Sequence, residues 1–157
     1  MLPRKKEADS ITVPALPKNA AQFSAWKEAV RNKVVAASGR SREAFLWMLD
    51  VEEVSVSYEK LAESGSKNES LDDKLRAAIT DVCAGELGKE LNRAAEEEKV
   101  KFRRPLAGRQ MLRLIYVYFQ TKQSLNQVYG LTNLMKVTYL GDKNMEQLVL
   151  QLMAESG

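Results

Sequence analysis

Apolar residues recur at steps of three and four through most of this chain, and this periodicity restricts its fold more than any other feature. The strongest pattern lies in residues 108–135, where Leu112, Ile115 and Phe119 share one stripe. Such spacing places side chains on one face of an α-helix. Only four prolines and eight glycines interrupt the chain. The sequence therefore predicts an all-α fold, a bundle of about seven helices with short connections.

The first two predicted helices have recognisable ends. Asn19 and Gln22 form a capping-box start, and Gly39 is placed to end the first helix. Ser41 can cap a short second helix. The apolar residues of this second helix cover more than one face, which predicts deep burial; they are Phe45, Trp47, Met48 and Leu49.

The later helices are delimited less sharply. We expect a long helix from Ser70 to kink or break near Gly85, and Pro105 suits the first turn of the next helix. That helix is expected to end near Thr121, with others starting at Ser124 and Asn144. Residues 1–18 hold three of the four prolines and no helical period, so they predict an extended arm.

The absence of histidine excludes most catalytic chemistry. The usual general base and the usual zinc ligand are both missing, and the single cysteine, Cys83, cannot form an internal disulfide. No phosphate-binding glycine motif occurs. Acidic neighbours such as Asp72 and Asp73 point to different faces of a helix, which favours a solvated surface over a magnesium site. We expect no enzyme activity, no cofactor, no metal and no small-molecule substrate.

The sequence also indicates the cellular compartment of the protein. No apolar run reaches the roughly 18 to 20 residues that a membrane span needs, and the N-terminal residues MLPRKKEADS lack the apolar stretch of a secretory signal. A single cysteine is typical of a reducing compartment. The sequence predicts a cytoplasmic protein without a membrane partner.

Charge is distributed unevenly along the chain. Residues 1–40 and residues 101–157 each hold eight basic and three acidic residues, whereas residues 41–100 hold eight basic and fifteen acidic residues. Basic ends and an acidic middle suit head-to-middle association of identical chains, or binding of a polyanion. The alternative is an uneven surface of the kind that many small domains have.

One basic cluster is a candidate nucleic-acid site. Arg109 and Arg113 are four residues apart, so they share a helix face on which they could bind a phosphate. A solvated basic face that offsets Glu96–Glu98 is the alternative. The candidate RNA-binding residues, including three from the arm, are Lys101, Arg103, Arg104, Arg109, Arg113, Arg4, Lys5 and Lys6.

The order of the helical segments resembles the capsid region of the Gag polyprotein of copia-type LTR retrotransposons. The segments that carry the resemblance are FSAWKEAV, GRQMLRLIYVYFQ, LNQVYGLTNLMKV and GDKNMEQLVLQLM. The chain lacks the cysteines and histidine of the zinc knuckle common in such proteins. Beyond the arm predicted at 1–18, the resemblance implies a capsid-like N-terminal domain at 19–137 and the first helix of a second subdomain at 138–157.

The resemblance further implies a structural Gag protein that self-assembles into a homo-oligomeric shell, a virus-like particle, around RNA. By the same resemblance the self-association residues would be Trp26, Val30, Met145 and Leu148. For each of these apolar residues the core of a monomer is the favoured alternative. Two other interpretations stay open, namely a helical adaptor that binds a partner helix in a groove and a basic RNA-binding module.

Overall fold

The computed structural model describes the backbone of residues 6–138 and the side chains of residues 6–125. Within these residues the all-α prediction is confirmed, because no strand is present. The elements are α1 (Ala20–Ser38), α2 (Ser41–Leu49), the short 3-10 helix η1 (Lys60–Ala62), α3 (Glu69–Val82), α4 (Gly85–Phe102) and α5 (Gly108–Thr138). The helix predicted from Asn144 lies outside the described residues. The chain divides into two compact units, Met1–Phe119 and Gln120–Gly157, and the groove and surfaces considered below belong to the first.

The ends of α1 confirm the predicted capping residues. The Asn19 side chain accepts a hydrogen bond from the Gln22 backbone N–H at 3.0 Å, and the Gln22 side chain accepts one from the Lys18 N–H at 3.2 Å. Gly39 ends the helix in the left-handed conformation, with φ at 73°. A glycine adopts this conformation without the steric penalty that a side chain would bring.

The break predicted near Gly85 separates α3 from α4. Gly85 has a φ of 66° and is the first residue of α4. The helix then continues through the acidic run to Phe102. α3 and α4 are therefore two separate helices.

α5 differs at both ends from the helix that was predicted between Pro105 and Thr121. It begins at Gly108, three residues after Pro105, and it continues through Ser124 to Thr138 as a single helix. The expected break near Thr121 is wrong. No glycine or proline lies between Gly108 and Gly130 to end the helix, and Ser124 is tolerated inside it.

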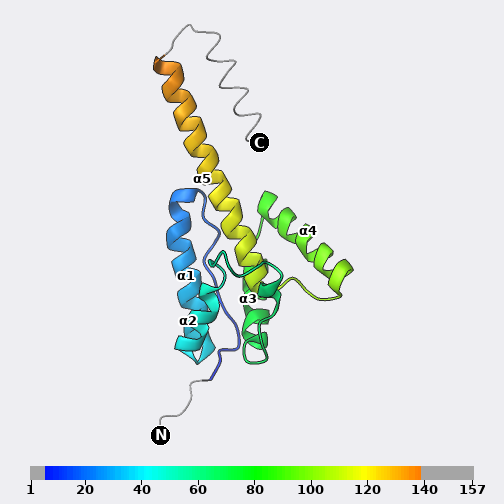
Figure 1. The fold of residues 1–157 in the computed structure, drawn as a ribbon. Coiled ribbons are helices and arrows are strands. Elements are labelled where there is room, and N and C mark those ends of the chain that lie inside the picture. Colours follow the sequence, from blue (N-terminus) through cyan, green and yellow to red (C-terminus); the bar gives the residue numbers. More distant parts are fainter. Residues whose placement is uncertain (1–5, 139–157) are drawn as a thin grey trace. The chain divides into compact units, whose positions relative to one another are not determined.

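The core of the first unit gathers side chains from α1 to α5. Val30, Leu75, Ile79 and Ile115 are fully buried at its centre. Figure 1 shows α1 and α2 on one side of the first turns of α5 and α4 on the other side. None of the helices in the described part of the chain combines the length and apolarity needed to cross a bilayer.

Residues 6–18 contain no helix and pack against this core. Ile11 and Val13 are buried, and the Trp26 indole N–H donates a hydrogen bond to the Pro14 carbonyl at 3.0 Å. The Ala8 N–H also donates to the carbonyl of Ala37 at 2.8 Å. The described part of the arm is thus an integral part of the domain.

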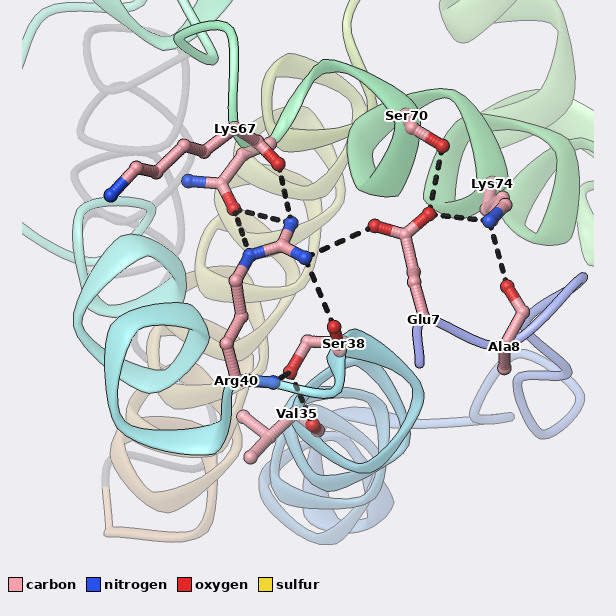
Figure 2. A network of polar contacts seen from close by, with 9 residues as sticks. Glu7, Ala8, Val35, Ser38, Arg40, Lys67, Ser70 and Lys74 are labelled. Carbon is pink, nitrogen blue, oxygen red and sulfur yellow. Dashed lines mark hydrogen bonds and ion pairs between the residues drawn. The ribbon is translucent and has the colours of Figure 1, made fainter. Parts of the chain in front are cut away.

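Glu7 anchors the start of this segment. Figure 2 shows its carboxylate between Arg40 on one side and Ser70 and Lys74 on the other. Burial alone would raise the pKa of Glu7, but the hydrogen bonds from these three side chains outweigh it and hold the pKa below its ordinary value of 4.5. Arg40 also donates to the carbonyl of Lys67 at 2.6 Å. One carboxylate therefore joins the arm to the α1–α2 connection and to α3.

Candidate functional site: an apolar groove with a basic rim

A groove of about 750 Å³ lies between α3, α4 and the segment that leads into α5. Its apolar lining includes Leu91, Leu106 and Met111, which also belong to the core. Four basic residues and one acidic residue line it as well; they are Arg76, Lys99, Arg103, Arg104 and Glu96. The groove therefore combines an apolar floor with a predominantly positive rim.

Arg103 lies at the rim in a conformation that is unfavourable for its residue type. It ends α4 with a φ of 54°, and it is the one described non-glycine residue with a positive φ. A side chain in this left-handed conformation costs roughly 1–2 kcal/mol, which is why glycine is common at such helix ends. The Arg103 side chain is exposed, and no described residue forms an ion pair or hydrogen bond with it. Its guanidinium therefore remains available to a molecule outside the domain.

Arg104 and Lys101 differ in their surroundings. The Arg104 Nε donates to the Glu98 carboxylate at 2.8 Å, and its guanidinium lies 4.5 Å from the centre of the Phe102 ring. Glu98 is only 4% exposed, so Arg104 neutralises a buried charge. Lys101 is exposed. Of the predicted cluster, Lys101 and Arg103 are thus the residues with freely exposed cationic groups.

Arg109 does not have the phosphate-binding role that its spacing suggested. Its side chain is 3% exposed, and it donates to the Trp47 carbonyl, the Asp50 carboxylate and the Glu63 carbonyl, each at 3.0 Å. Burial lowers the pKa of Arg109, and the neighbouring Asp50 counteracts that effect. The prediction is wrong because the N-terminus of α5 packs inside the domain and carries Arg109 with it.

Arg113 is likewise used internally. Its guanidinium donates to backbone carbonyls in residues 50–56, at 3.1 Å to Val51, 2.9 Å to Asp50 and 2.9 Å to Glu53, with a further hydrogen bond to Val56. Arg109 and Arg113 do share a helix face, as predicted. That face packs against the loop after α2, so the prediction that this pair binds a phosphate is wrong.

The other predicted residues are placed as follows. Trp26 is 5% exposed and Val30 is fully buried, so both belong to the core of the monomer and the prediction that they lie on a self-association surface is wrong. Lys6 is exposed. Arg4, Lys5, Met145 and Leu148 lie outside the described residues, and their predicted roles stay predictions.

The exposed face of α2 is a surface that the sequence did not reveal. The helix buries Ala44, Trp47 and Met48, whereas Phe45 is 42% exposed and Leu46 is 57% exposed. The expected deep burial of the whole helix is wrong. Apolar residues all around a short helix indicate either burial or an unpartnered apolar surface, and one sequence does not separate the two.

Cys83 lines the groove as a half-buried free thiol. Burial raises the pKa of this thiol, which lowers the fraction of reactive thiolate. Among the residues whose side chains are described, no group of three or more potential ligands is arranged to hold a metal ion.

Comparisons of this chain with protein-family models, with curated proteins and with solved structures found no match.

Proposed function

We propose that this protein is a structural, capsid-like protein that self-associates through its surfaces and binds RNA through its exposed basic residues. The observation that carries the proposal is the presence of two candidate contact surfaces on one helical domain, the groove between α3 and α4 and the exposed apolar face of α2. Distinct surfaces on one subunit allow heterologous contacts, which close into rings or continue into larger assemblies. The resemblance to Gag capsid segments supports the same proposal.

The charge layout also supports self-association. Glu43 on α2 is exposed, and Arg103 at the rim of the groove is exposed and has no ion-pair partner among the described residues. When two surfaces of one molecule carry opposite charges, the acidic surface of one copy is attracted to the basic surface of another copy and repelled by its acidic surface. Such contacts weaken as salt screens them.

RNA binding is proposed for the exposed basic residues only. Lys101, Arg103 and Lys6 are exposed, whereas Arg4 and Lys5 lie outside the described residues and are included from the sequence alone. Such a surface binds phosphates without reading sequence, so its affinity falls steeply with salt. Arg109 and Arg113 are left out because their guanidinium groups already bind backbone carbonyls and, for Arg109, the Asp50 carboxylate of the same domain.

A helical adaptor is the second candidate, and the groove itself favours it. A groove with an apolar floor is suited to the apolar face of a partner helix. The adaptor and capsid interpretations differ in self-association, because an adaptor needs no contact between copies.

Light scattering across a range of protein concentration, at low and high salt and with and without RNA, tests the proposal. We expect the mass to rise with concentration, to fall with salt, and to rise further with RNA, with rings or shells visible by electron microscopy. A constant monomer mass in every condition would contradict the capsid proposal and favour the adaptor. Assembly that occurs only with RNA would favour a plain RNA-binding module.

A further inference from the structure

The exposed face of α2 has the chemistry of a small docking element. Phe45 and Leu46 are adjacent and about half exposed, and the exposed Glu43 lies one turn before Leu46 on the same face. Residues 41–54 hold four acidic residues and one basic residue. Of the acidic residues, Asp50 is paired with Arg109 and Glu52 with Lys27 and Arg31, so α2 presents two large apolar side chains beside the exposed carboxylate of Glu43.

The groove has the complementary chemistry. Its floor is apolar and its rim holds four basic residues, of which Arg76, Lys99 and Arg104 are paired with Asp73, Glu96 and Glu98. Arg103 is exposed and unpaired among the described residues, and its left-handed backbone would suit glycine better. An arginine at such a position indicates that its side chain contributes something other than stability of the domain.

The two surfaces cannot meet within one molecule, because the start of α5 separates them. Arg109 binds the carbonyl of Trp47 on α2, and Met111 lines the groove. Residues two apart on an α-helix point to nearly opposite sides. Figure 1 likewise shows α2 and α4 on opposite sides of this part of α5. Any contact between them therefore joins different copies.

We propose that α2 of one copy docks into the groove between α3 and α4 of the next copy. Phe45 and Leu46 enter the apolar floor, and Glu43 pairs with Arg103 at the rim. The contact is heterologous, so each copy uses its α2 and its groove with two different neighbours. This inference rests on the proposed self-association and names the surfaces that carry it.

Sedimentation velocity of the full chain without RNA is the test. We expect Leu46→Asp to weaken self-association at least tenfold, since it places a charge in the apolar floor. Val117→Asp is the matched control because Val117 is also an exposed apolar residue of a helix, 50% exposed, and does not line the groove. It should leave association unchanged.

Charge reversal makes the test specific for the pairing. Arg103→Glu and Glu43→Arg should each abolish association alone, because each places like charges at the contact. An equal mixture of the two variants should associate again, since every contact between unlike copies then joins opposite charges. Recovery in the mixture is not expected if either variant merely misfolds.

Arg103→Gly separates binding from folding. We expect the melting temperature to rise, because glycine relieves the left-handed conformation, while association weakens. Wild-type association in Leu46→Asp and in both charge variants would overturn the inference and leave the proposed self-association standing. A wild-type chain that stays monomeric at every concentration would overturn both.

Discussion

The backbone N–H of Gly108, the first residue of α5, donates a hydrogen bond to the carboxylate of Asp72 on α3 at 2.9 Å. The N–H of Arg109 donates to the same carboxylate at 3.1 Å. The first N–H groups of a helix have no partner within it, so a residue 36 positions earlier in the chain supplies the cap of α5. The groove is bounded by α3 and the start of α5, and this contact holds the two together.

Replacing Gly108 tests how closely these helices approach. A Cβ atom at Gly108 would lie 2.9 Å from the backbone of Arg76 and 2.9 Å from that of Asp72. We expect Gly108→Ala to lower the free energy of unfolding by about 1–3 kcal/mol, because backbone atoms must move apart. Urea denaturation measures the change.

Gly88 provides the control for that variant. A Cβ at Gly88 would meet its nearest atom, the carbonyl carbon of Cys83, at an ordinary 3.6 Å. Gly88→Ala should therefore stabilise the protein by roughly 0.5–1 kcal/mol, since alanine is a better helix former. Equal effects of the two substitutions would contradict the close approach of α3 and α5.

Asp72→Ala tests the distant cap. Asp72 is 3% exposed, and its removal leaves two buried N–H groups without an acceptor. We expect a loss of about 1–3 kcal/mol in the free energy of unfolding. Asp73→Ala is the control, because Asp73 is exposed and, among the described residues, forms an ion pair only with Arg76 on the same helix; it should cost well under about 1 kcal/mol.

Arg113→Ala tests whether this residue holds the loop after α2. We expect amide hydrogens in residues 50–56 to exchange faster, because four hydrogen bonds from the guanidinium to carbonyls are lost. RNA affinity should be unchanged, whereas Lys101→Ala should reduce it. A loss of RNA affinity in Arg113→Ala with unchanged exchange would restore the phosphate-binding role.

Glu7→Gln tests the anchor of the arm through its pH dependence. Because its partners lower the pKa of Glu7 in the folded protein, the unfolded chain binds more protons in the acidic range. The stability that Glu7 contributes is therefore present above its ordinary pKa of 4.5 and is lost as pH falls through the lowered value.

Urea denaturation of wild type and Glu7→Gln from about pH 7 to about pH 3 measures this difference in the free energy of unfolding. The wild type should be the more stable at neutral pH, and the difference should shrink as the pH falls below the ordinary pKa. Asp9→Asn removes an exposed carboxylate two residues away and controls for the lost charge. A difference that is independent of pH would show that Glu7 does not anchor the arm as a carboxylate.

The sequence by itself determined those helix ends that are set by residues close to them in the chain. Asn19 and Gln22 start α1, Gly39 ends it, and Gly85 separates α3 from α4. Each feature follows from backbone and side-chain chemistry within a few residues, and periodicity alone is sufficient to predict the all-α class. The basic segment at the C-terminal end of α4 was also visible in the sequence, and Lys101 and Arg103 are exposed there.

Only the tertiary structure decided where α5 begins and what its arginines do. The cap comes from Asp72, and the acceptors of Arg109 lie 46 to 62 residues away, so no local pattern indicates them. Packing likewise decided that Trp26 is buried while Leu46 is exposed. Both are apolar residues at helical spacing, and which face of a helix meets the core depends on the positions of the other helices.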